Sequence, residues 1–125
     1  MKLEEFDLRL YGLLRRCLRK GASSTAADPL TPELRSALVD NFDRLRVGEL
    51  CGCGDSDCRS FKSQAFKRED GLRRIRFIVN GELHVLCDDN GVIHRVVWFP
   101  GDATAPPSHA YAATSDGWVE LPIEP

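Results

Sequence analysis

The sequence lacks any long apolar run. Charged side chains interrupt its hydrophobic stretches, with Arg9, Arg15 and Arg16 breaking the first one, so none approaches the ~20 residues that span a bilayer. Its first five residues, MKLEE, carry acids where a secretory signal peptide carries bases. From these absences we expect a soluble, cytoplasmic protein with no membrane partner.

The chain also lacks a strong net charge and the short motifs of several enzyme classes. A formal net charge of -2 argues against a protein whose whole surface binds nucleic acid. It has no Gly-rich phosphate loop, no serine-nucleophile elbow and no HExxH helix. No internal repeat is evident, and 125 residues of which 42% are apolar suffice for one core. We therefore expect a single domain over residues 1–125.

Residues 1–48 are expected to form a helical hairpin. Over residues 3–20, leucines and Phe6 recur at the three-and-four spacing of one helix face, and Gly21 is a suitable stop. Cys17 lies on this apolar stripe and is interpreted as a core residue. A second helix is expected to start at Thr31-Pro32-Glu33, which combines a hydroxyl cap, a proline and an acid.

Residues 49–99 are expected to hold a Cys-rich loop and an antiparallel meander. Three runs rich in Ile, Val, Phe and Trp, at 73–79, 82–87 and 92–99, are separated by the hairpin signals Asn80-Gly81 and Asn90-Gly91. Residues 100–125 are expected to be a loop and a short edge strand at 117–121. The predicted fold class is α+β: two N-terminal helices packed on an antiparallel meander sheet of four to six strands.

The strand register can be predicted by asking which turn keeps charge out of the core. A three-residue loop over 79–81, with Gly81 left-handed, groups Ile75 and Phe77 with the apolar side chains of the next strand. At the second turn, the grouping that keeps Arg95 outside places His94 on the face of Cys87. The third run is apolar on both sides, which indicates a central strand or a subunit interface.

The most informative stretch is residues 51–58, which contains three of the five cysteines. Cys51, Cys53 and Cys58 stand among glycines and small polar residues, in the spacing C-x-C-x4-C. An odd number of cysteines in a cytosolic chain favours metal binding over disulfides, and a Cys51–Cys53 bridge would be strained. Three soft thiolates indicate a structural zinc site, which takes four ligands.

The fourth zinc ligand must come from elsewhere in the chain. Cys87 is favoured for its thiol, so the predicted metal ligands are Cys51, Cys53, Cys58 and Cys87. The other candidates are His84, His94, His109, Asp55 and Asp57.

Two other uses of these cysteines rank lower. A reactive thiol needs a lowered pKa, whereas Asp55 and Asp57 act against that and only Arg59 offsets them. Copper(I) is also chemically compatible with a C-x-C pair.

A basic run follows the cysteines and supports an alternative function. It is interleaved with Phe61, Phe66 and Phe77, as on a surface that holds phosphates and stacks bases. Its members are Arg59, Lys62, Lys67, Arg68, Arg73, Arg74 and Arg76. Because the chain is slightly acidic overall, a solvated sheet face is the favoured interpretation.

Cys87 and His94 also resemble a nucleophile beside a base, and suggest a small enzyme as a further alternative. Their apolar strand neighbours favour packing instead. We therefore expect a small cytosolic, non-enzymatic binding or interaction module with a structural zinc loop. Its partner would be a protein, or a second copy that meets it through an apolar sheet face. Nucleic-acid binding, and an enzyme built on Cys87 and His94 or an open metal position, stay as alternatives.

Overall fold

The computed structural model describes residues 1–24, 27–53, 58–68, 70–100, 111–114 and 117–120, the last two ranges as backbone only. In chain order the elements are α1 (Leu3–Phe6), α2 (Leu8–Lys20), α3 (Pro32–Asn41), the 3₁₀ helix η1 (Phe42–Arg44), β1 (Val47–Leu50), β2 (Phe61–Ser63), β3 (Arg73–Phe77), β4 (Gly81–Cys87), β5 (Ile93–Pro100), β6 (Tyr111–Thr114) and β7 (Gly117–Glu120). Within these ranges, no helix is both long and apolar enough to cross a membrane.

The predicted first helix is two helices, because Asp7 breaks it. Asp7 has extended backbone angles, and its Oδ1 accepts hydrogen bonds from the N–H groups of Arg9 and Leu10 at 3.0 and 3.3 Å. An aspartate in this position is a favourable N-cap, so α2 starts afresh after it. The predicted end is confirmed, since α2 stops at Lys20 and the Gly21 N–H bonds the Cys17 carbonyl.

The start of the next helix is also confirmed. The Thr31 hydroxyl accepts a hydrogen bond from the Leu34 N–H at 3.1 Å, and Pro32 occupies the first turn. The Arg35 guanidinium then ties α3 to the end of α2, donating to the carbonyls of Cys17, Leu18 and Gly21. Three backbone carbonyls at the end of α2 are satisfied in this way.

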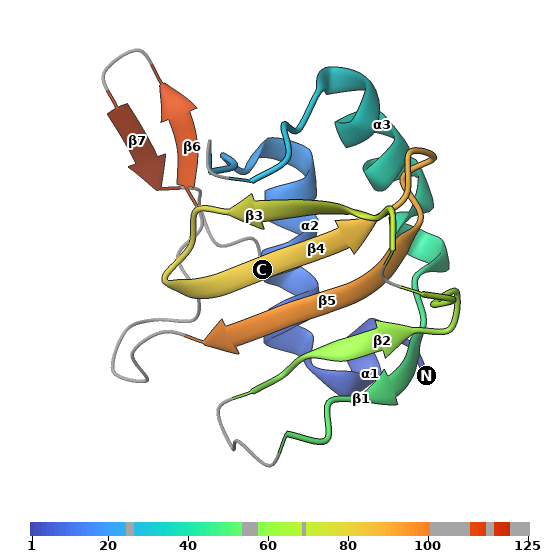
Figure 1. Cartoon of the computed structure of the whole chain (residues 1–125). Helices are drawn as coiled ribbons and strands as arrows, with labels where there is room; N and C mark the ends of the chain where they lie inside the picture. The colour runs from blue at the N-terminus through green and yellow to red at the C-terminus, as the bar shows by residue number, and fades with distance from the viewer. Residues whose placement is uncertain (25–26, 54–57, 69, 101–110, 115–116, 121–125) are drawn as a thin grey trace.

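The main sheet is antiparallel and five-stranded, in the order β1-β2-β5-β4-β3. The predicted α+β fold is therefore confirmed. Helices α1 and α2 lie behind this sheet in Figure 1, with α3 beside the end where β4 turns into β5. β5 is the central strand of this order, as the sequence predicted as one of two options.

The predicted register is confirmed at the β3–β4 turn. Ile75 lies opposite Val85 and Phe77 opposite Leu83, and Gly81 has φ +97°. These side chains join the leucines of the helices in one core. That core comprises Leu3, Leu10, Leu13, Leu14, Cys17, Leu18, Leu34, Leu38, Phe42, Leu45, Val47, Phe61, Ile75, Phe77, Leu83, Val85, Cys87, Ile93, Val96 and Trp98.

The β4–β5 register holds only in part. Leu83 pairs with Trp98 and Val85 with Val96, as expected, but an irregularity between Leu86 and Cys87 places Ile93 opposite Cys87. His94 is still buried, at 7% exposure. A β-bulge places two residues of one strand opposite a single residue of its partner, so the consecutive residues Ile93 and His94 can both be buried at this point.

The C-terminal prediction needs correction in one part. The short strand expected at 117–121 is present as β7, which pairs with β6 in a separate two-stranded sheet. Residues 111–114, expected to be loop, form β6. At the outer edge of β3, the N–H groups of Ser24 and Asp28 donate to the carbonyls of Arg76 and Arg74 at 2.7 and 3.0 Å.

Candidate metal centre

The β1–β2 hairpin carries the cysteine loop at its tip. Leu50 pairs with Phe61, and the Cys51 N–H donates to the Ser60 carbonyl at 3.0 Å, so the ladder continues to the first cysteine. On the returning arm, the Arg59 N–H bonds the Trp98 carbonyl of β5 at 2.9 Å. Both ends of the loop are thus held by backbone hydrogen bonds.

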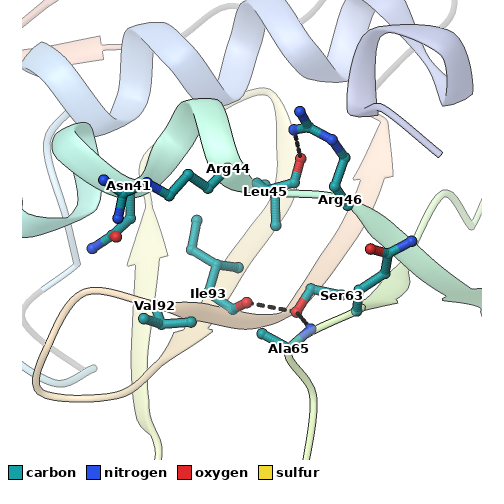
Figure 2. Close-up of a pocket in the computed structure, with 9 residues that line it drawn as sticks. Asn41, Arg44, Leu45, Arg46, Ser63, Ala65, Val92 and Ile93 are labelled. Atoms are coloured by element: carbon teal, nitrogen blue, oxygen red, sulfur yellow. Dashed lines mark hydrogen bonds between the residues drawn. The ribbon is translucent and has the colours of Figure 1, made fainter.

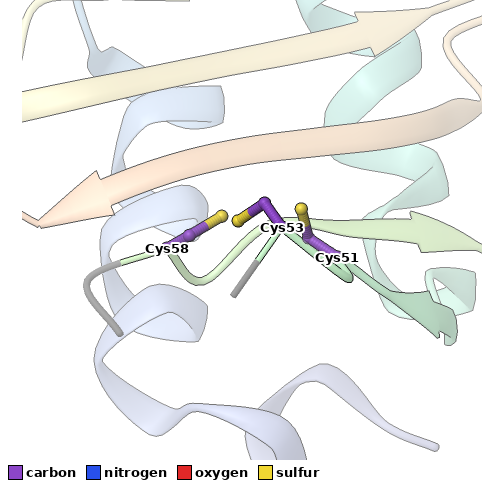
Figure 3. Close-up of side chains that lie close together, drawn as sticks. All are labelled: Cys51, Cys53 and Cys58. Atoms are coloured by element: carbon purple, nitrogen blue, oxygen red, sulfur yellow. The ribbon is translucent and has the colours of Figure 1, made fainter. Parts of the chain in front are cut away.

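The three sulfurs of this loop converge. The Sγ atoms of Cys51, Cys53 and Cys58 all lie within 4.8 Å of one another (Figure 3). A tetrahedral zinc ion with Zn–S bonds of 2.3 Å requires sulfurs about 3.8 Å apart. A shift of about 1 Å or less per pair would therefore close the cluster around a cation. Cys51 and Cys53 are exposed and Cys58 is half-buried, so a metal ion can reach them from solvent.

The surroundings of Cys58 favour its ionised form. Partial burial acts to raise its pKa, but hydrogen bonds from the Ser60 hydroxyl, the Ser60 N–H and the thiols of Cys53 and Cys51 outweigh burial and lower it. The Cys58 sulfur lies 3.2 Å from Ser60 Oγ. A metal binds the thiolate form, so this environment favours metal binding near neutral pH.

The other two cysteines differ sharply from the loop. Burial raises the pKa of Cys17 to about 12, and it likewise raises the pKa of Cys87 to about 12. Both side chains are fully buried in the core. The prediction that Cys17 is a packing residue is confirmed.

The structure does not bring Cys87 to the other predicted ligands. The loop is attached to Trp98, which lies opposite Leu83, and Cys87 is four residues further along β4. Four residues of strand span about 13 Å. Cys87 is thus absent from the sulfur cluster, and its proposed role as fourth ligand has no support in this geometry.

The two histidines considered as alternative fourth ligands contact other side chains. His84 lies beside Arg74, with its Nδ1 3.3 Å from the guanidinium, and burial together with that charge lowers its pKa. His94 Nε2 pairs with Asp88 Oδ2 at 3.1 Å at the β4–β5 turn. Neither histidine joins the sulfur cluster in the described part of the chain. Asp55, Asp57 and His109 lie outside the described residues.

A small cavity of about 210 Å³ borders the cluster. It is lined by Glu49, Leu50, Cys51, Gly52, Phe61, Lys62 and Arg95. Lys62 and Arg95 are cross-strand partners in this lining, and the Lys62 ammonium lies 4.7 Å from the centroid of the Phe66 ring.

The predicted basic run does not form one stripe. Arg74 and Arg76 share the sheet face away from α2, and Arg73 alternates to the opposite side. Several members pair with acids: Arg73 with Asp89, Arg76 with Glu82 at 3.8 Å, and Arg59 with Asp7 at 3.8 Å.

A shorter row of cations crosses the face that α1 and α2 leave uncovered, which we call the outer face. Pairing across the strands places Glu49, Lys62, Arg95, Leu86 and Arg74 side by side in that order. The sequence alone did not indicate that Arg95 belongs to this row. Arg95 lies outside the contiguous basic run and comes beside Lys62 only when the strands pair.

Cys87 and His94 do not form a catalytic pair in the described structure. Ile93, not His94, lies opposite Cys87, and the His94 ring pairs through its Nε2 with Asp88. With its pKa raised to about 12, Cys87 stays a thiol at neutral pH.

Ser60 is a supporting residue that sequence reasoning missed. Its hydroxyl is buried, accepts the Trp98 N–H at 3.0 Å and contacts Cys58. The only signal in the sequence is a hydroxyl two residues after a cysteine, which is too common to be specific.

Comparison with protein-family models, curated proteins and solved structures finds no match to this chain. The geometry of the residues must therefore carry the functional argument. What it supports directly is a cluster of three cysteines able to hold a metal ion.

Proposed function

We propose that this protein is a small binding module whose β1–β2 loop is held by a structural zinc ion on Cys51, Cys53 and Cys58. The observation that carries the proposal is the mutual approach of the three sulfurs to within 4.8 Å. Thiolate ligands suit zinc, which has no geometric preference of its own beyond four-coordination in structural sites. Copper(I) is the competing soft cation.

The fourth ligand is proposed to be a carboxylate of the same loop, Asp55 or Asp57. Both lie between Cys53 and Cys58 in the sequence, so they can reach the ion without help from another strand. Zinc accepts carboxylate oxygens alongside thiolates. A closed four-ligand site would stabilise the loop rather than perform chemistry.

The partner is proposed to be an acidic protein surface that docks on the outer face. Lys62, Arg95 and Arg74 lie in one row there, with Glu49 as the acid at its end. Two copies meeting through this face would oppose like charges, which is unfavourable. The charge pattern therefore favours a different protein over a second copy.

Metal content tests this proposal. Protein purified without chelator should contain one zinc per chain, and Cys51→Ser, Cys53→Ser and Cys58→Ser should each lower that content. Cys87→Ala is the matched control, because it removes a thiol of the core and should leave zinc at one per chain. Wild-type protein without metal, with all three loop thiols reacting freely, would end the proposal. Loss of zinc in Cys87→Ala would return Cys87 to the ligand set.

Nucleic-acid binding is the second candidate, favoured by the same row of cations. Single-stranded binders combine a basic track with aromatic side chains, and Phe99 shares the outer face by alternation with Arg95. Affinity for a single-stranded oligonucleotide should fall steeply with salt and with Arg74→Glu. Arg19→Glu, an exposed residue of α2, supplies the same charge change elsewhere. No retention on a DNA or heparin column at low salt would remove this candidate.

A further inference from the structure

A second cavity lies at the end of the sheet away from the cysteines. It has a volume of about 390 Å³, within the range of small-molecule sites. It opens between η1 and the ends of β2 and β5, as Figure 2 shows. The lining residues are Asn41, Arg44, Leu45, Arg46, Ser63, Gln64, Ala65, Val92 and Ile93. We call it the Arg44–Arg46 pocket.

The floor of the pocket is apolar and needs no polar ligand. Leu45 and Ile93 belong to the hydrophobic core, and Val92 is half-buried beside them. The polar groups here already have partners: the Ser63 hydroxyl donates to the Ile93 carbonyl at 2.6 Å and accepts the Ala65 N–H at 3.2 Å. A ligand would therefore place hydrocarbon on this floor.

The rim of the pocket is cationic. Arg46 Nη1 donates to the carbonyls of Asp43 and Leu45 at 2.8 and 2.9 Å, which fixes the side chain. Arg44 is exposed, and no ion pair joins Arg44 or Arg46 to a carboxylate within the described residues. The two guanidiniums thus bring positive charge to the mouth of an apolar cavity.

Asn41 completes the rim. Its Nδ2 donates to the carbonyls of Ala37 and Asn90 at 2.9 and 3.0 Å. Both bonds use the amide nitrogen, so the orientation of the side chain is set by α3 and the β4–β5 turn. Backbone carbonyls therefore hold Asn41 and Arg46 in place, and Arg44 is the exposed member of the rim.

We propose that the Arg44–Arg46 pocket binds a small amphipathic carboxylate. The carboxylate would accept hydrogen bonds from the guanidiniums, which match its geometry, and the apolar tail would cover Leu45 and Ile93. Inorganic phosphate would satisfy the arginines but leave the floor exposed. A neutral alkyl compound would cover the floor but leave the arginines without a counter-charge. The site is independent of the cysteine cluster.

The experiment is a titration of the purified 125-residue chain followed by two-dimensional NMR. Hexanoate is the probe, with hexan-1-ol and acetate as matched compounds that lack the charge or the tail. Hexanoate should give saturable shifts at Leu45, Ser63 and Ile93, and each matched compound should bind about tenfold more weakly.

Variants locate the site. Arg44→Met should weaken hexanoate about tenfold and leave hexan-1-ol unchanged, whereas Arg19→Met, with the same charge change on α2, should alter neither. Ala65→Trp should fill the cavity and block both compounds. The proposal is wrong if hexanoate gives no saturable shifts in these residues. Equal affinities for hexanoate and hexan-1-ol would also overturn it. So would equal losses of hexanoate affinity in Arg44→Met and Arg19→Met.

Discussion

The Ser60 hydroxyl accepts a hydrogen bond from the backbone N–H of Trp98 at 3.0 Å, while its oxygen lies 3.2 Å from the sulfur of Cys58. A hydroxyl has one proton and two acceptor positions, so Ser60 can accept both bonds while Cys58 is a thiol and donate its own proton to the Cys58 thiolate. One buried hydroxyl therefore links the core strand β5 to the cysteine cluster at its edge.

We predict that Ser60→Ala raises the pKa of Cys58. The substitution removes a hydrogen bond that lowers this pKa, so alkylation of Cys58 in metal-free protein should slow near pH 7. It also leaves the Trp98 N–H without its acceptor, which should lower the free energy of unfolding by about 1–3 kcal/mol. Ser36→Ala, at an exposed position of α3, is the control. If the alkylation rate of Cys58 depends on pH in the same way in Ser60→Ala and in the wild type, Ser60 does not lower the pKa of Cys58.

We predict that alkaline pH destabilises the reduced, metal-free protein through its buried thiols. Cys17 and Cys87 have folded-state pKa values raised to about 12, whereas an unfolded cysteine ionises near pH 8.5. The contribution of these two thiols to the free energy of unfolding is fully present below about pH 8.5. It is lost as pH rises towards 12, because over this range the unfolded chain binds fewer protons than the folded chain. Two such groups change the free energy of unfolding by at most about 2.7 kcal/mol per pH unit.

Urea denaturation between pH 8 and 10.5 measures this loss. Cys17→Ala should be less stable than the wild type at pH 8, because it leaves a small cavity, yet its stability should decline less steeply with pH. A decline as steep in Cys17→Ala as in the wild type would mean that other groups cause it.

We predict that Gly91→Ala is much more damaging than Gly71→Ala. Both glycines have positive φ, +77° and +78°, so both variants carry the left-handed strain of about 1–2 kcal/mol. A Cβ on Gly91 would also lie 2.5 Å from the Ala37 Cβ and 2.6 Å from the Ala37 carbonyl carbon, whereas nothing lies within 4 Å at Gly71. Because α3 must move to relieve this contact, Gly91→Ala should lose about 1–3 kcal/mol more of the free energy of unfolding than Gly71→Ala, measured by chemical denaturation. Equal losses in the two variants would show that the turn does not pack on α3 as described.

We predict that a chelator loosens residues 51–58 without unfolding the domain. A structural zinc can supply about 10–16 kcal/mol where folding depends on it wholly. Here the core is assembled from helices and strands that do not include the loop cysteines. Far-UV circular dichroism should stay constant on chelation, while amide exchange in the loop should rise. Global loss of the dichroism signal would contradict this, and Cys58→Ser, which should not respond to chelator, is the control.

The sequence predicted those parts of the fold that depend on neighbouring residues. Alternation across the Asn80-Gly81 turn was sufficient to set the β3–β4 register, because the wrong register would bury arginines. Thr31 and Gly21 marked helix ends through their own chemistry. Asp7 was missed as a cap, since the leucine spacing continues across it and periodicity alone does not detect a break.

Features that depend on pairing distant strands could not be predicted in this way. Cys87 was favoured as a ligand for its thiol, but the strand order and the attachment of the loop to Trp98 place it at the far end of β4. The bulge beside Cys87 and the pairing of Lys62 with Arg95 likewise appear only once the sheet is assembled. The convergence of Cys51, Cys53 and Cys58 was predicted, because their eight-residue span constrains them locally.

Zinc K-edge X-ray absorption of the purified protein counts the sulfur and oxygen ligands of the ion. We predict three sulfur scatterers at about 2.3 Å and one oxygen, because the loop supplies three thiolates and a carboxylate. Four sulfurs would require Cys87 to join the site against the described fold. No sulfur in the first shell, or no zinc in the sample, would contradict the claim that Cys51, Cys53 and Cys58 form a metal site.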